Sequence, residues 1–305
     1  MNNRNLIGAC RLSENQASPA AIMPMKTYDS GRTARSRGCL FLGGCHVVRV
    51  ALFLAAAFCV AIPAAVGEEQ AKGWICLFNG SDMEGWTPKF AGHPAGENLD
   101  EIFRVEDDML RVIYDPEAHP EWEGRFGHLF FKHEFSHYLL RFEYRITGST
   151  LSGSPAWAFR NSGVVIHGQP PETMARDQDF PTGIEVQLLG GDGENPRTTA
   201  NVCTHGTHVH YRGELDKRHC INSKSKTYHG DDWIEVEIEV RGHRVIRHKI
   251  DGETVLEYER PVLTDETEIE RRGHAELDSG TISVQAKGHP VDFRRIRLKP
   301  LPVSD

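Results

Sequence analysis

The sequence predicts an all-β domain folded as a two-sheet antiparallel jelly-roll sandwich. Residues 68–305 contain about a dozen short segments rich in β-branched and aromatic residues. Turn-forming Gly, Pro, Asn and Asp separate these segments, and no stretch shows the sustained periodicity of a long helix. Many short strands over this length are typical of one large sandwich rather than a small immunoglobulin-like domain.

The clearest strand lies at residues 233–240, where apolar side chains alternate strictly with glutamates. Asp251-Gly252 then predicts a tight hairpin between residues 244–250 and 253–258. Residues 192–220 contain few apolar side chains and predict a loop with one short strand, and residues 263–272 predict a loop or a short helix. Further strands are expected at residues 74–78, 103–106, 109–113, 127–131, 137–146, 208–211, 280–287 and 291–298.

Two predicted strands, residues 162–168 and 183–189, frame the stretch that we consider functional. Successive side chains of a strand point to opposite faces, so apolar residues on one face leave polar ones on the other. A loop over one sheet edge is expected between the two strands. The polar residues expected on the exposed face or at its entrance are His167, Glu185, Gln187, Arg160 and Asn161.

The first 67 residues predict a leader that is removed on export. Residues 50–62 form an apolar run of the length of a signal-peptide core, preceded by arginines. Ala65 and Gly67 supply the small residues that a cleavage site requires. Residues 68–305 are then the mature domain, in the periplasm or outside the cell. A retained membrane anchor is the alternative interpretation.

The charge of the mature chain excludes some partners. Residues 68–305 carry 28 Lys and Arg against 41 Asp and Glu. This acidity argues against binding to nucleic acid or to an anionic membrane surface. Nothing in the sequence fixes the oligomeric state.

Two cysteines of the mature domain lie among several histidines. Export favours a disulfide between Cys203 and Cys220. The alternative is a zinc site formed by these cysteines with neighbouring histidines, although their spacing matches no zinc-finger pattern. A divalent metal held by histidine and carboxylate is the cofactor that we consider.

Several motifs, in order, resemble the 3-keto-disaccharide hydrolase domain family. The opening motif is LFNGSDMEGW at residues 77–86. The resemblance covers residues 73–301 and implies a concanavalin A-like jelly roll, export, and action on glycosides oxidised at carbon 3 of the sugar. The later motifs are Asn161–Val164, Gly183–Leu189, Trp233–Val236, Asp251–Tyr258 and Pro290–Ile296.

A 3-keto sugar has an acidic proton on carbon 2, so a base can start elimination of the group on carbon 1. A two-carboxylate glycosidase needs a second acid, but Gln187 stands two residues after Glu185. We therefore expect catalysis by Glu185 with His167 or His208 as base. The side chains expected to bind sugar hydroxyls are Arg160, Asn161, Gln187, Gln285 and Lys287.

The sequence thus predicts an exported enzyme that cleaves an oxidised glycoside or oligosaccharide. A non-catalytic carbohydrate-binding module that uses the same polar sheet face is the alternative.

Overall fold

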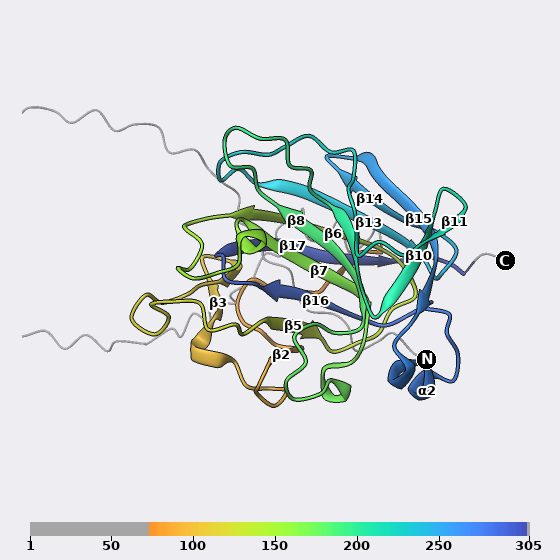
Figure 1. The fold of residues 1–305 in the computed structure, drawn as a ribbon, viewed down its shortest axis with the longest axis horizontal. Helices are drawn as coiled ribbons and strands as arrows, with labels where there is room; N and C mark the ends of the chain where they lie inside the picture. The colour runs from red at the N-terminus through yellow and green to blue at the C-terminus, as the bar shows by residue number, and fades with distance from the viewer. Residues whose placement is uncertain (1–72, 304–305) are drawn as a thin grey trace, which may run out of the picture. The chain divides into compact units, whose positions relative to one another are not determined.

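The computed structural model describes residues 73–303, so the expected leader lies outside the described residues. Two antiparallel sheets stack face to face, as Figure 1 shows, with β7, β8 and β16 in one layer and β6, β13 and β17 in the other. The predicted all-β, two-sheet antiparallel jelly roll is confirmed. Within residues 73–303, no helix has the length and apolar character needed to cross a bilayer.

The larger sheet has ten strands in the order β11-β10-β15-β14-β13-β6-β17-β4-β3, and β1 also pairs with β17. Every strand pair in it is antiparallel, which suits a sheet built from hairpins and returning crossovers. Its strands are β1 (Ile75–Cys76), β3 (Phe103–Glu106), β4 (Met109–Val112), β6 (His137–Ile146), β10 (Thr207–Tyr211), β11 (Glu214–Asp216), β13 (Ile234–Arg241), β14 (Ile246–Ile250), β15 (Glu253–Leu263) and β17 (Val291–Pro300).

The smaller sheet has seven strands in the order β12-β9-β8-β7-β16-β5-β2. Its strands are β2 (Trp86–Phe90), β5 (Gly127–Phe131), β7 (Asn161–Gly168), β8 (Gly183–Leu189), β9 (Asn201–His205), β12 (Cys220–Ile221) and β16 (Thr281–Ala286). Short 3₁₀ turns η1 (Leu99–Glu101), η2 (Ala156–Ala158) and η3 (Pro171–Thr173) lie in the connections.

The hydrophobic core fills the space between the two sheets. In β13 every second residue is buried, as its alternating sequence predicts. In β8, Ile184, Val186 and Leu188 are fully buried against the opposite sheet. Burial of each such side chain contributes about 1.5–3 kcal/mol to folding. The inward direction of these residues turns Glu185 and Gln187 to the outer face of the seven-stranded sheet.

The predicted hairpin at Asp251-Gly252 is present, and both residues have positive φ, as a type I′ turn requires. Residues 192–220 contain more strand than expected, because β9, β11 and β12 add to the predicted β10. These strands are short and their apolar residues sparse, so periodicity gives little signal there. Residues 263–272 do form a short helix, α2 (Glu266–Arg272).

The sequence explains where α2 begins and ends. The Asp265 carboxylate accepts hydrogen bonds from the backbone of Thr267 and Glu268, which caps the first turn. Two arginines occupy the last turn, where they complement the helix dipole. Gly273, with φ of +79°, ends the helix in the left-handed conformation.

A disulfide joins Cys203 on β9 to Cys220 on β12, and the two residues pair directly across these strands. The cross-link therefore fixes the short edge strand β12 to the sheet. Replacing both cysteines with serine is expected to lower the free energy of unfolding by about 3 kcal/mol, because the unfolded chain loses a loop constraint. Denaturant unfolding measures this loss. The double alanine variant should lose a similar amount, and an unchanged midpoint in both variants would contradict the prediction.

Two core histidines make stability depend on pH. Burial lowers the pKa of His167 and of His248 to about 4. An unfolded histidine titrates near 6.5, so the unfolded chain binds more protons between pH 6.5 and 4, and stability falls as pH drops through that window. Each histidine accounts for up to about 3 kcal/mol.

The test is urea unfolding at pH 7.0 and pH 4.5 for the wild type and for His248→Gln. The variant should lose less stability between the two pH values, because it removes one of the groups that titrate. Equal losses in both proteins would show that His248 does not carry this dependence.

Candidate functional site

Glu185 lies at the centre of the candidate site. Its Oε1 atom accepts a hydrogen bond from Nζ of Lys287 at 2.6 Å, and its Oε2 atom lies 2.8 Å from Nε2 of His205. The amide of Gln285 donates to Oε2 at 3.3 Å. Glu185 is only 1% exposed, so protein groups replace the water that normally solvates a carboxylate.

Strand register brings these side chains together. Val165 on β7 pairs with Glu185 on β8 and with Ser283 on β16, and Gln285 follows two residues later on the same face. Gly163 provides the space between them. A Cβ atom there would lie 2.2 Å from Oε1 of Gln285 and 3.0 Å from Cγ of Glu185. The site therefore requires glycine at this position.

The charges of the cluster hold Glu185 ionised. Burial alone raises the pKa of this carboxyl, but the ammonium of Lys287 and the hydrogen bond from His205 outweigh that effect and hold the pKa well below its usual range. Burial also lowers the pKa of Lys287, which makes its ammonium a better proton donor. Because an ionised carboxylate only accepts hydrogen bonds, Nε2 of His205 carries a proton in this contact.

His128 on β5 extends the cluster, with its Nε2 atom 3.2 Å from the amide nitrogen of Gln285. Burial lowers the pKa of His128 well below its ordinary value, with Lys287 adding to the effect, so this ring is neutral. Several buried polar atoms on this sheet have no hydrogen-bond partner within the described part of the chain, which leaves bonding capacity for a hydroxylated ligand. These atoms are His128 Nδ1, Gln285 Oε1, Ser283 Oγ and Asn161 Oδ1.

Phe180 covers the cluster. Its ring stacks on His205 with centroids 4.6 Å apart and an interplanar angle of 9°. The edge of the same ring meets His128 at 5.6 Å, and Nζ of Lys287 lies 5.3 Å from the ring centroid. The aromatic ring thereby shields the ion pair from water.

The segment that carries Phe180, residues 169–182, is tied to the sheet. Buried Lys89 donates hydrogen bonds from Nζ to the carbonyls of Phe90 and Arg176, both at 2.8 Å. The Gln178 amide donates to the carbonyl of Phe180 and to the side chain of Gln169. The predicted loop therefore lies across the sheet face as a defined cover.

Four residues expected at the site lie on the outer face with Glu185. Gln285 and Lys287 contact it directly, whereas Gln187 accepts a hydrogen bond from Asn201 at 3.1 Å. Asn161 is buried, and its amide donates to the carbonyl of Trp157 at 2.9 Å.

The expected position of His167 on the outer face is wrong. The pairing of β7 with β16 shifts between Val165 and Gly168, and His167 adopts a φ of +50°. Its ring is fully buried, and its Nε2 atom lies 3.2 Å from the carbonyl of Gly242, just beyond β13 in the opposite sheet. A bulge breaks the two-residue alternation, which turns this side chain into the core.

Arg160 also lies apart from Glu185, contrary to expectation. Its φ of +42° turns the chain just before β7. The guanidinium donates to the carbonyls of Ile146 and Gly230 and lies 3.5 Å from Asp231. Arg160 therefore fastens the end of the sandwich instead of binding in the Glu185 cluster.

The sequence analysis predicts His208 near Glu185, but this residue lies on β10 in the ten-stranded sheet. The chain passes from β9 to β10 at Gly206, whose φ is +62°. This crossing between sheets separates His208 from Glu185 and leaves His205, three residues earlier, as the histidine that contacts the carboxylate.

Sequence reasoning missed His205, His128 and Phe180. His205 belongs to a segment, Cys203-Thr204-His205, that the sequence predicts as a loop. The alternation over β9 is too short to indicate a strand. His128 lies in a strand whose five residues are all buried, so no alternation marks its outer face. Phe180 comes from a loop, and no local pattern indicates where a loop lies.

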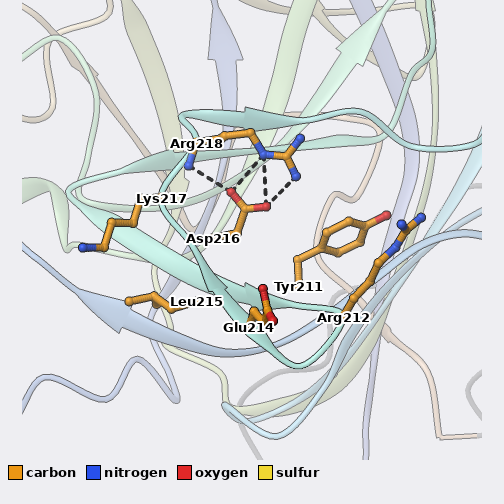
Figure 2. Close-up of a pocket in the computed structure, with 7 residues that line it drawn as sticks. All are labelled: Tyr211, Arg212, Glu214, Leu215, Asp216, Lys217 and Arg218. Atoms are coloured by element: carbon orange, nitrogen blue, oxygen red, sulfur yellow. Dashed lines mark hydrogen bonds and ion pairs between the residues drawn. The ribbon is translucent and has the colours of Figure 1, made fainter.

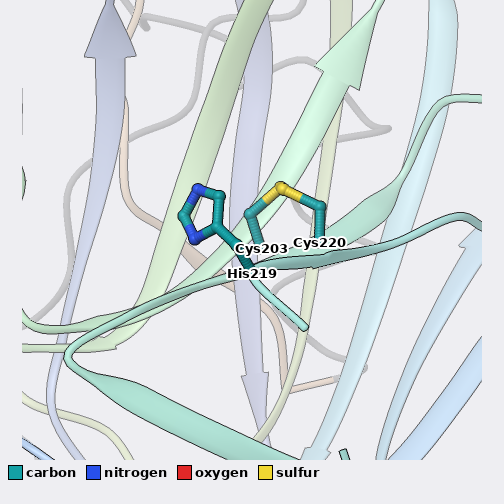
Figure 3. Close-up of side chains that lie close together, drawn as sticks. All are labelled: Cys203, His219 and Cys220. Atoms are coloured by element: carbon teal, nitrogen blue, oxygen red, sulfur yellow. A yellow bond between two sulfur atoms is a disulfide. The ribbon is translucent and has the colours of Figure 1, made fainter. Parts of the chain in front are cut away.

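The zinc alternative at Cys203 and Cys220 is wrong. The potential ligand atoms of Cys203, Cys220 and His219 lie within 4.8 Å of one another. Figure 3 shows the three side chains close together, with a bond between the two sulfur atoms. The two sulfur atoms are bonded to each other, so neither is available as a thiolate ligand.

A pocket of about 500 Å³ lies elsewhere, at the hairpin of β10 and β11 (Figure 2). Its main interaction is the exposed ion pair of Arg218 with Asp216, which contributes little energy. It contains no buried acid–base pair, so we prefer the Glu185 cluster as the functional site. The pocket is lined by Tyr211, Arg212, Glu214, Leu215, Asp216, Lys217 and Arg218.

The solved structures similar to this chain include proteins described as glycosyl hydrolases and a carbohydrate-binding module. A candidate glycosyl hydrolase from Parabacteroides distasonis is 18% identical, covers 77% of this chain and 97% of its own, and has a TM-score of 0.47. The β-glucanase of Bacillus licheniformis is 10% identical, with 75% and 97% covered and a TM-score of 0.41. Carbohydrate-binding module CBM66 from Bacillus subtilis is 8% identical, with 70% and 94% covered and a TM-score of 0.40.

Comparison with curated protein sequences finds no match. The 3-keto-alpha-glucoside-1,2-lyase-like domain matches residues 73–299, most of the chain and nearly all of the described part. This match confirms the resemblance that the sequence motifs indicate. The chain therefore belongs to the 3-keto-alpha-glucoside-1,2-lyase-like domain family.

Proposed function

We propose that this protein is an exported enzyme that cleaves glycosides oxidised at carbon 3 of the sugar. The family supports a carbohydrate-active function, and the specific reaction is our inference. The observation that supports this reaction is the buried Glu185, which is hydrogen-bonded to both Lys287 and His205. That arrangement provides an oriented base and a cation beside it.

The proposed reaction begins with removal of the proton from carbon 2. The ketone accepts the electron pair as an enolate. Collapse of the enolate breaks the bond between carbon 1 and its oxygen, and that oxygen takes up one proton to leave as the alcohol. The products are an unsaturated ketone and the free aglycone. Water that adds back to the double bond completes a net hydrolysis. No oxidant or reductant is consumed.

His205 is the proposed base. Its Nε2–H group donates a hydrogen bond to Glu185. The lone pair of Nδ1 is then proposed to remove the proton from carbon 2. The carboxylate orients the ring and stabilises the positive charge that appears on it, as the acid of a catalytic triad does for its histidine. At 13% exposure, the His205 side chain is the most accessible of the three groups in this contact network.

Lys287 is proposed to stabilise the enolate. Its ammonium holds Glu185 ionised, and it is the cation that can approach the developing enolate oxygen. Phe180 lies over Lys287, so a sugar must displace this ring to reach the ammonium. The unpartnered oxygen of Gln285 can accept a hydrogen bond from a sugar hydroxyl at the same place.

Elimination suits this site better than two-carboxylate hydrolysis. A two-carboxylate glycosidase needs a second acid across the bond from the first. Among residues 73–303, the side chains that hydrogen-bond to Glu185 are a lysine, a histidine and an amide, and none is a carboxylate. A metal held by Glu185 and His205 remains a proposal, and it would have to share the carboxylate with Lys287.

A direct test mixes the purified protein with methyl 3-keto-α-glucoside and with unoxidised methyl α-glucoside. We expect methanol release from the oxidised compound alone, because only the ketone acidifies the proton on carbon 2. Saturable binding without turnover, with and without added Mn²⁺ or Zn²⁺, would instead establish the carbohydrate-binding module. Loss of turnover in chelator, restored by one of these ions, would identify a metal requirement.

Two matched histidine variants test the assignment of the base. His205→Asn should lower kcat by at least about 100-fold, because general-base catalysis contributes about 10²–10⁴-fold. His208→Asn should leave kcat within about twofold, since β10 belongs to the other sheet. Equal losses in the two variants, or a larger loss in His208→Asn, would rule out His205 as the base.

A further inference from the structure

A second histidine, His219, lies against His205 on the side away from Lys287. The strand order of the smaller sheet puts β8 and β16 on one side of β9 and the edge strand β12 on the other. Lys287 directly follows β16, whereas His219 directly precedes β12. The rings of His219 and His205 are 5.2 Å apart between centroids, with an interplanar angle of 76°. His205 therefore stands between a buried cation and a second histidine.

His219 is exposed, yet several contacts fix its position. Its Nδ1 atom lies 2.8 Å from the carbonyl of Thr204, and because a carbonyl only accepts, Nδ1 carries a proton there. The amide and hydroxyl of Thr204 donate in turn to the His219 carbonyl, at 2.8 and 3.3 Å. The disulfide between Cys203 and Cys220 ties the adjacent residues, and Figure 3 shows the His219 ring beside it. Nε2 is then the ring nitrogen that can exchange a proton with water or a ligand.

Cleavage of the glycoside needs a proton donor as well as a base. As its bond to carbon 1 breaks, an alkoxide oxygen must take up a proton, because an alcohol is a poor leaving group without one. Glu185 cannot supply this proton, since its pKa lies well below the usual range and the group is ionised. Lys287 donates to that carboxylate and is assigned to the enolate oxygen on carbon 3. The donor to the oxygen on carbon 1 is therefore a different group.

We propose that His219 is the general acid that protonates the leaving oxygen on carbon 1. This inference rests on the proposed function, because it assigns the second proton transfer of the same elimination. Carbon 2 lies between carbon 3 and carbon 1 in the sugar, just as His205 lies between Lys287 and His219 on the sheet. With carbon 2 at His205 and the ketone toward Lys287, the oxygen on carbon 1 faces His219.

The two histidines return to their starting states in one turnover. The proton on carbon 2 passes to Nδ1 of His205, and the proton on Nε2 of His219 passes to the leaving oxygen. When water then adds to carbon 1 of the unsaturated ketone, Nε2 of His219 takes a proton from that water, and His205 returns its proton to carbon 2. The net change is one glycosidic bond broken and one water consumed, without an oxidant or a reductant.

Two leaving groups that differ in their need for a proton test this role. Methanol must be protonated to leave methyl 3-keto-α-glucoside, whereas nitrophenolate leaves 4-nitrophenyl 3-keto-α-glucoside as a stable anion. His219→Gln should lower kcat/KM for the methyl glycoside by at least about 100-fold, the lower range of general-acid catalysis, and leave that for the nitrophenyl glycoside unchanged. His205→Asn should lower kcat/KM for both compounds, because both need the base. Methanol is followed by NMR and nitrophenolate by its absorbance.

Hydrogen exchange in D₂O gives a second readout. In His219→Gln the base is intact, so carbon 2 of the methyl glycoside should still exchange its proton for deuterium faster than without protein, although cleavage is slow. His210→Gln is the matched control. His210 lies on β10 in the other sheet, and its Nδ1 atom is likewise 3.0 Å from a backbone carbonyl, that of Arg260. This variant should process both glycosides at the wild-type rate.

The inference is overturned if His219→Gln lowers kcat/KM equally for both glycosides, or if it lowers neither. An equal loss is what a purely structural role predicts, because a distorted site loses the base together with the acid. Either result with an active wild type rejects His219 alone and leaves the proposed function standing. A wild type that releases neither methanol nor nitrophenolate rejects the proposed function and the role of His219 with it.

Discussion

The buried contact of Glu185 with Lys287 is the interaction on which the site depends. Moving two charges out of water is expensive, and their attraction offsets that cost only when the geometry is good and the remaining atoms are hydrogen-bonded. His205 and Gln285 meet that condition on the carboxylate side. Removing one partner would leave an uncompensated buried charge. The residues around the pair must therefore keep both charges hydrogen-bonded.

The site stands on sheet strands, and loops cover it. Glu185, Gln285 and His128 come from neighbouring strands whose register is fixed by backbone hydrogen bonds, so their relative positions are rigid. Phe180 comes from the segment between β7 and β8, which lies over the sheet face and is tied there by Lys89 and Gln178. The ring of Phe180 keeps water away from the charged groups. It also explains why the charged groups are buried although they lie on the outer face of a sheet.

Much of the fold follows from local pattern. The strict alternation of residues 233–240 predicts β13, and Asp251-Gly252 predicts its neighbouring hairpin, because side-chain period and positive φ are properties of a few adjacent residues. The same two-residue alternation predicts that Glu185 and Gln187 point away from the core. Sequence alone therefore determined the sandwich class, the outward direction of Glu185, and the candidates Gln285 and Lys287.

The tertiary structure decided which histidine reaches Glu185. A bulge next to Gly168 turns His167 into the core, and the crossing at Gly206 moves His208 to the other sheet. Both effects depend on pairing with strands distant in sequence, which a local pattern does not specify. His205 and Phe180 meet only because β9 lies beside β8 and the segment before β8 folds back over the sheet. Alternation fixes the face of a side chain, whereas long-range pairing fixes its neighbours.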